Sequence, residues 1–127
     1  MFDDLSQTVL RKMAANLAEM SFESITITRS TKVDGPKIIY VNDAFTDLTG
    51  YAASDVIGQT PGVLQGSDTD PATLRRLDET VERGETFHGT AINYRQDGTP
   101  FEMEWKVTFA GSDEDADYYL AVQREAR

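Results

Sequence analysis

The most constraining feature of the sequence is the alternation of apolar and polar residues between Pro100 and Ala110. Successive side chains of a β-strand point to opposite faces, so this pattern predicts a strand with one buried face. The apolar face carries Phe101, Met103, Trp105, Val107 and Phe109. A strand over Thr86–Arg95 and the turn residues Asp97-Gly98, where glycine supplies a positive φ, complete a predicted antiparallel hairpin.

The remaining chain supplies short elements on both sides of this hairpin. Strands are predicted over Ser24–Arg29, Lys37–Val41 and Tyr118–Arg124, and helices over Asn42–Thr49, Ala53–Ile57 and Pro71–Arg83. Gln59–Asp70 is predicted to be irregular. A first, amphipathic helix is predicted over Asp3–Met20, where Asp3 and Asp4 suit the positive end of the helix dipole. Its apolar stripe consists of Leu5, Val9, Met13, Leu17 and Met20.

The last predicted strand is apolar on both faces, which implies that both faces are covered. An outer sheet patch is therefore predicted from Ile92, Tyr94, Tyr118, Leu120 and Val122. An apolar patch of this kind usually meets a partner. We expect a homodimer formed through the N-terminal helix and this outer face. The alternative is a helix that covers the sheet of its own chain and has no signalling role.

Charge and composition exclude several classes of protein. The 127 residues include 22 acidic and 12 basic side chains, a formal charge of −10, which disfavours binding to nucleic acid. No apolar run is long enough to cross a membrane, and no secretory signal is expected at the start. The absence of cysteine excludes disulfides and thiolate catalysis and fits a cytoplasmic location.

Four segments resemble the PAS family, and three further segments are similar to its LOV branch, the flavin-binding blue-light sensors. The PAS segments are Ile38–Phe45, Leu48–Tyr51, Asn93–Arg95 and Asp97–Phe101; the LOV segments are Leu64–Gly66, Thr69–Pro71 and Val122–Gln123. The resemblance implies an α+β PAS fold: a five-stranded antiparallel sheet with helices on one face. Residues 1–21 would form an N-terminal amphipathic cap helix and residues 22–127 the LOV-like core.

The resemblance also implies a noncovalent flavin, FMN or FAD, with one chemical difference. Blue light makes a cysteine of LOV domains add to the flavin ring, and here Pro61 stands in its place. Proline has no nucleophile, so no adduct is expected. Three amides match family residues that contact the ring, namely Gln65, Asn93 and Gln123. Three further positions near the ring differ from the family: Trp105 replaces a phenylalanine, and Met103 and Thr60 replace asparagines.

The family's phosphate-binding arginines correspond here to Gly62 and Asp78. A carboxylate at this place disfavours a phosphate. Arg75 and Arg76, one turn away on the predicted helix, are candidates to replace the lost charge.

Two functions follow from these residues. The first is a cysteine-less, LOV-like sensory module in signal transduction that responds to redox state or to light-driven reduction of the flavin. Trp105 and Tyr119 would donate electrons, the Gln123 amide would respond, and a downstream signalling protein would receive the output. The second is a ligand-free dimerisation or docking module whose cavity Trp105 and Met103 fill in part.

An enzyme is not expected, because no catalytic motif or phosphate-binding loop is present. His88 is predicted on the outward face of a strand without a matching carboxylate, so neither catalysis nor metal binding is expected there. The acidic loop Asp113–Asp117 lacks the spacing of a calcium-binding loop, so no metal site is predicted.

Overall fold

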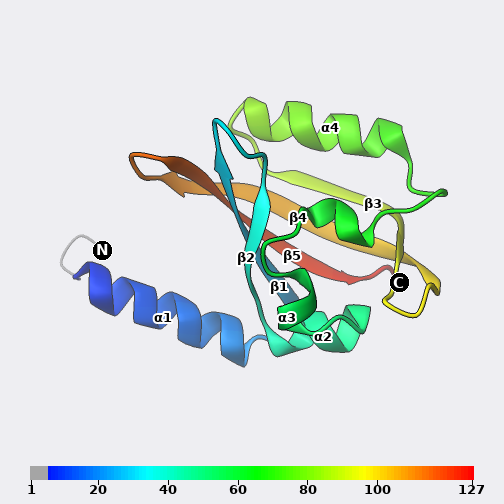
Figure 1. Ribbon diagram of the computed structural model, residues 1–127, viewed down its shortest axis with the longest axis horizontal. Coiled ribbons are helices and arrows are strands. Elements are labelled where there is room, and N and C mark those ends of the chain that lie inside the picture. The colour runs from blue at the N-terminus through cyan, green and yellow to red at the C-terminus, as the bar shows by residue number, and fades with distance from the viewer. Residues whose placement is uncertain (1–5) are drawn as a thin grey trace.

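Five strands form one antiparallel sheet in the order β2-β1-β5-β4-β3 (Figure 1). The computed structural model describes residues 6–127. The strands are β1 (Ser24–Thr31), β2 (Lys37–Val41), β3 (Phe87–Tyr94), β4 (Pro100–Ser112) and β5 (Ala116–Glu125). The helices are α1 (Gln7–Met20), α2 (Asp43–Thr49), α3 (Ala53–Val56), the 3-10 turn η2 (Pro61–Leu64) and α4 (Pro71–Glu82).

Local signals explain where these elements begin and end. The Asn42 side chain accepts a hydrogen bond from the Phe45 N–H and caps α2, which Gly50 ends with φ +79°. Asp70 caps α4 in the same way, and Pro71 occupies its first turn. Gly98 has φ +88° in the turn between β3 and β4, as the sequence predicts.

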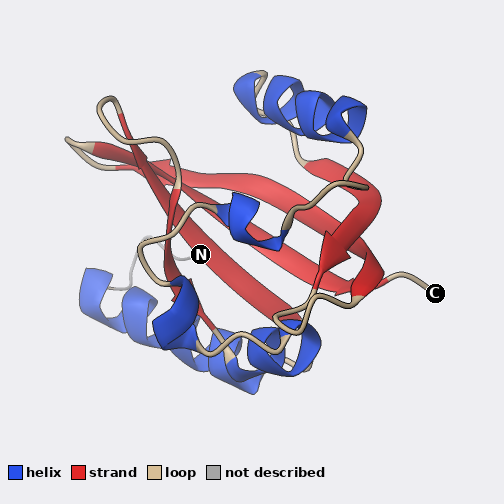
Figure 2. Cartoon of the chain, turned by 45° about the vertical axis from the view of Figure 1, so that its right-hand side comes forward, coloured by secondary structure: helices blue, strands red, loops and turns tan. Residues whose placement is uncertain are grey.

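The predicted fold class and all predicted elements within the described residues are confirmed. Helices α2, α3, η2 and α4 lie over one face of the sheet, and Figure 2 shows η2 over its middle. The η2 turn falls inside the segment expected to be irregular. Phe109, expected on the buried face of β4, is 45% exposed, because it lies near the far end of the hairpin that β4 forms with β5.

The core fills the space between the inner sheet face and these helices. Its most completely buried side chains include Phe45 from α2, Phe87 from β3, Ile38 from β2 and Val56 from α3. Each comes from a different element, so the core ties the short helices to the sheet.

Helix α1 projects away from the sheet of its own chain (Figure 1). The stripe residues Val9, Met13, Leu17 and Met20 are all exposed, between 41% and 76%. Ala18 is the buried residue of α1, and its carbonyl accepts a hydrogen bond from Asn42 Nδ2 at 2.8 Å. The helix therefore does not cover its own sheet through the stripe. Asp3, Asp4 and Leu5 lie outside the described residues.

The outer sheet face remains partly open in the described chain. Leu120 and Val122 of β5 point outward and are partly exposed. They pair with Ile27 and Ile25 of β1, which the sequence-based patch did not include. Tyr94 has a different role from the one expected, because its hydroxyl accepts a hydrogen bond from the Asp68 N–H at 3.0 Å. No helix of the described residues is long and apolar enough to span a membrane.

Candidate functional site

A cavity of about 280 Å³ lies between the inner sheet face and the helices η2 and α4. Its walls come from β1, β3, β4 and β5 on one side and from η2 and α4 on the other. Small-molecule sites in proteins usually measure roughly 300–1,000 Å³. The cavity lies just below this range and therefore suits a compact ligand.

The cavity contains the three amide side chains that the sequence selects. Gln65, Asn93 and Gln123 all line it, from the end of η2, from β3 and from β5. Asn93 is 3% exposed, and its side-chain amide makes no hydrogen bond to any described residue. Within the described residues, no side-chain nitrogen or oxygen sealed from solvent lacks a partner, so the Asn93 amide is open to the cavity. Asn93 therefore presents two donors and an acceptor to whatever occupies the cavity.

Gln123 differs from Asn93 because the protein already holds its amide. Ser24 Oγ donates a hydrogen bond to Gln123 Oε1, and Gln123 Nε2 donates one to Thr26 Oγ1, both at 2.8 Å. One N–H and one lone pair of the amide remain available. Sequence reasoning missed these two β1 partners, although both fall on the inward parity of the strand.

Aromatic and apolar side chains form the rest of the wall. Trp105 is 6% exposed, lies opposite Gln123 in the β4–β5 register, and packs against Phe87 with ring centres 5.1 Å apart. Met103 and Tyr119 also line the cavity, so neither Trp105 nor Met103 closes it. Pro61 of η2, which the resemblance matches to the LOV cysteine, lies on the lining of the cavity.

Two of the predicted site residues lie elsewhere. Thr60 and Arg75 are exposed and are not among the residues that line the cavity. Arg76 is engaged with β3: its Nη1 donates to the His88 carbonyl at 3.2 Å, and its guanidinium lies 4.6 Å from the Phe87 ring centre. Neither arginine therefore supplies a charge to the cavity in this arrangement.

The end of the cavity beside α4 is acidic. Asp78 lines it as the sequence suggests, and so does Glu82, one helical turn later, which sequence reasoning missed. Burial raises the pKa of Tyr119, and the negative charges of Asp117 and Glu82 raise it further. A phosphate placed here would meet like charge.

Comparison with known proteins decides the family. A PAS domain family profile matches residues 23–125. The chain belongs to the PAS domain family. A blue-light-activated histidine kinase 2 from Erythrobacter litoralis is 38% identical over 122 residues, 87% of this chain and 34% of the relative. A blue-light photoreceptor from Listeria monocytogenes is 31% identical over 106 residues, 84% of this chain and 42% of the relative. The chain thus spans less than half the length of both curated relatives.

Solved structures place this PAS domain in the LOV branch. The LOV domain of a blue-light activated histidine kinase from Erythrobacter litoralis has a TM-score of 0.71 and 34% identity, covering 81% of this chain and 94% of that one. An RNA-binding light-oxygen-voltage receptor has a TM-score of 0.80 and 27% identity, covering 97% of this chain and 35% of that one. This PAS domain is thus LOV-like and carries no cysteine.

The residues of this PAS domain fit one part of a flavin better than the other. Asn93, with its free amide, and Gln123 suit the polar edge of a flavin ring, and Trp105 supplies an aromatic wall. Asp78 and Glu82 do not suit a phosphate. If a flavin binds, the amides would hold and orient its ring, and the ring would supply light absorption and electron acceptance.

The outer face of the PAS domain requires one correction. His88 does have a carboxylate partner, because its Nε2 lies 2.6 Å from Glu104 Oε2 on the neighbouring strand. The sequence did not reveal the register that places Glu104 diagonally opposite. Arg124 Nε also donates to Glu104 at 2.8 Å, and hydrogen bonds from Arg124 and then His88 lower the pKa of Glu104.

The acidic loop of the PAS domain has a structural role. The Asp113 carboxylate accepts hydrogen bonds from the Ala116 N–H and from the Tyr118 hydroxyl, which closes the turn between β4 and β5. Within residues 6–127, no group of three or more acidic, histidine or cysteine side chains is arranged to hold a metal ion.

Proposed function

We propose that this PAS domain is a sensory module that binds a flavin without a covalent bond. The observation that carries the proposal is Asn93, a side chain 3% exposed that faces the cavity with no hydrogen-bond partner among the described residues. The amide is open to the cavity, so an apolar occupant would strip it of solvent at a cost of roughly 1–3 kcal/mol, whereas an occupant with a polar edge would hydrogen-bond to it. A flavin ring has such an edge, and its flat, apolar faces suit the aromatic and apolar walls around Trp105.

The proposed response is reduction of the flavin by light or by cellular redox state. Pro61 offers no nucleophile, so no bond from the protein to the ring is available. Trp105 and Tyr119 line the same cavity and would each be able to give one electron to a light-excited ring. The oxidised side chain would then be restored by a thiol reductant from solution.

The Gln123 amide is the group proposed to respond to the redox state of the flavin ring. Both of its partners, Ser24 and Thr26, are hydroxyls, and a hydroxyl can donate or accept. The amide can therefore turn over and keep both hydrogen bonds by reversing their direction. One orientation presents an N–H to the cavity and the other presents the carbonyl oxygen. Gln123 can therefore hydrogen-bond to an acceptor or to a donor on the ring and still keep both hydrogen bonds to β1.

The proposed output is a contact on the opposite face of the same strand. Leu120 and Val122 alternate with Gln123 along β5 and point outward. Val9, Met13 and Met20 lie about half a turn from the buried Ala18 on α1, so this apolar stripe faces away from its own chain. We infer that the stripe of one copy packs on the outer sheet face of a second copy, and that a downstream protein reads the change.

The dimer has its own test. Met13→Glu places a charge in the stripe and is expected to convert a dimer to a monomer in size-exclusion chromatography with light scattering. Thr8→Glu introduces the same group off the stripe and serves as the control. A monomeric parent chain, or a Met13→Glu protein that remains dimeric, would contradict this arrangement.

The flavin is tested by the absorption spectrum of the purified chain. We expect either bound flavin as isolated or binding of added flavin, followed by loss of the oxidised spectrum under blue light with a thiol reductant. Trp105→Phe and Tyr119→Phe should slow this loss, because each removes a donor. A colourless protein that binds none of the added flavins would contradict the proposal.

The second candidate is a ligand-free module for dimerisation or docking. The observation in its favour is Gln123, whose amide is held at both ends by β1 hydroxyls with no ligand present. In that case dimerisation would not change on addition of flavin or on illumination. A cytoplasmic location and the lack of enzymatic activity stay predictions.

A further inference from the structure

The cavity has a polar end and an acidic end. Gln123 and Tyr119 point into it from the same strand, four residues apart, which corresponds to about 13 Å along β5. The unpartnered Asn93 amide and Gln123 belong to the first end. Glu82, whose charge acts on Tyr119, belongs to the second, together with Asp78 one turn earlier on α4.

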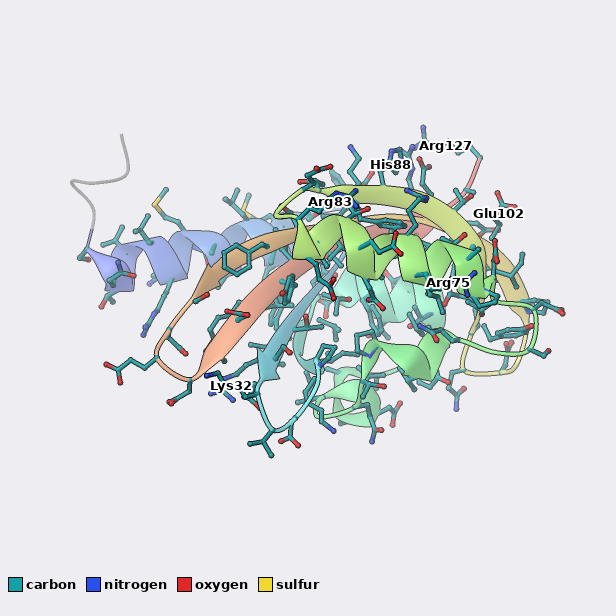
Figure 3. All side chains as sticks on the ribbon, turned by 90° about the horizontal axis from the view of Figure 1, so that it is seen from above. Lys32, Arg75, Arg83, His88, Glu102 and Arg127 are labelled. Atoms are coloured by element: carbon teal, nitrogen blue, oxygen red, sulfur yellow. The ribbon has the colours of Figure 1, made fainter. Side chains whose placement is uncertain are left out.

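The acidic end lacks a compensating cation. Of the described residues, those that line the cavity include no lysine, arginine or histidine. Arg76 is held by the His88 carbonyl and the Phe87 ring. Arg83 pairs with Glu85 at 3.3 Å, and Figure 3 shows it just beyond α4, with Arg75 on the helix itself. The carboxylates of Asp78 and Glu82 therefore determine the local charge.

We propose that the cavity takes a flavin without a phosphate, of the riboflavin class, in preference to FMN or FAD. This inference rests on the proposed function. The phosphate of FMN carries a charge of about −1.5 to −2 at pH 7 and would lie near two carboxylates. The hydroxyls of a neutral flavin side chain are donors, and the carboxylates of Asp78 and Glu82 are acceptors. The same two residues thus repel one class of ligand and hold the other.

The size of the cavity agrees with this choice. At about 280 Å³ it lies just below the usual range for small-molecule sites, which favours the smallest of the three flavins. A phosphate that lies outside the cavity would still be repelled by Asp78 and Glu82. Both carboxylates are exposed on the same side of α4, and the solvent between them and the phosphate screens their charge only in part.

The test compares riboflavin, FMN and FAD as ligands of the flavin-free chain. Binding is followed by equilibrium dialysis at low and at high salt. We expect riboflavin to bind roughly tenfold tighter than FMN at low salt, about the effect of one partly screened charge pair. The difference should shrink as salt is added, because screening weakens only the charged term.

A charge-neutral variant identifies the cause. Asp78→Asn with Glu82→Gln should tighten FMN binding by about tenfold and change riboflavin binding by no more than roughly twofold. Glu79→Gln, on the same helix but off the cavity lining, is the control and should change neither. A circular dichroism spectrum confirms that each variant is folded.

The outcomes separate this inference from the proposed function. Equal or tighter binding of FMN to the parent chain overturns the preference and leaves the flavin sensor in place. A preference that persists unchanged in the double variant overturns the role of the two carboxylates. If none of the three flavins binds, both proposals fall and the docking module remains.

Discussion

The two ends of the cavity show how one pocket can keep part of its family's chemistry and change another part. The polar end retains Asn93 and Gln123 in positions that suit a flavin ring. The acidic end carries Asp78 and Glu82, and the resemblance matches Asp78 to one of the family's phosphate-binding arginines. Since the two carboxylates lie on α4 and the two amides on β3 and β5, one set of side chains can change while the other stays. A fold therefore does not fix its ligand; the ligand must be argued from each group of residues.

The largest effect is expected from removing the wall that both ends share. Trp105 is 6% exposed and packs on Phe87, so Trp105→Ala should lower the free energy of unfolding by about 3–5 kcal/mol. Urea denaturation measures this loss in the free energy of unfolding. Phe109→Ala, at a 45% exposed position on the same strand, is the control and should cost far less. Similar losses in both variants would mean that Trp105 is not part of a packed core.

A smaller loss is expected from Gln123→Leu at the polar end. The substitution leaves the hydroxyls of Ser24 and Thr26 without the partner they have now. Buried groups without partners cost about 1–3 kcal/mol, so the variant should be less stable by that amount even without a ligand. A variant as stable as the parent would show that solvent reaches these hydroxyls and that β1 does not hold the amide.

Asn93→Leu should change the stability of the ligand-free protein much less than Gln123→Leu does. The Asn93 amide is open to the cavity and bonds to no described residue, so the substitution breaks no hydrogen bond within the protein, and the free energy of unfolding should change by less than about 1 kcal/mol. Flavin binding should weaken by roughly tenfold, because the ring loses its hydrogen bonds. Denaturation and flavin titration of the same preparation check both expectations.

The contrast between the two variants sharpens the comparison within the polar end. A loss of more than about 1 kcal/mol in the Asn93→Leu protein would mean that the amide already bonds to another group of the protein in solution. The Asn93 amide would then no longer support the flavin proposal.

The fold was predictable from sequence because its signals are local. The alternation through Phe101 and Trp105, the Asp97-Gly98 turn and Pro71 each determine a strand, a turn or a helix start without reference to distant residues. The five-stranded antiparallel sheet and the family followed from the resemblance, whereas the order of the strands in the sheet was not predicted.

The candidate site was predictable only in part, because a cavity depends on how distant segments meet. Strand parity placed Asn93 and Gln123 inward. It did not reveal that Ser24 and Thr26 satisfy Gln123, since these hydroxyls lie almost 100 positions away. Parity also could not show that Arg76 would turn to β3 and leave the acidic end without a cation. The partner of His88 was missed for the same reason, because it depends on register.

The smallest effect is expected outside the cavity, at the pair of Glu104 with Arg124 and His88. Because hydrogen bonds from Arg124 and His88 lower the pKa of Glu104, its ionised form is favoured in the folded state. That contribution is present above the unfolded-state pKa of about 4.3 and is lost as pH falls through the lower, folded value. Glu104→Gln should therefore lower the free energy of unfolding slightly at neutral pH. Between about pH 5 and pH 3 the stability of this variant should fall less than that of the parent. Urea denaturation across this range measures both curves.

The control for this prediction is Glu102→Gln, on the same outward face of β4, which pairs with no basic side chain of the described residues. Its curve should follow that of the parent through the acidic range. If Glu104→Gln also follows the parent, the pair makes no contribution to stability, as is common for exposed ion pairs. The face that would meet a second copy would then gain no stability from this pair, and both ends of the cavity would be unaffected by that result.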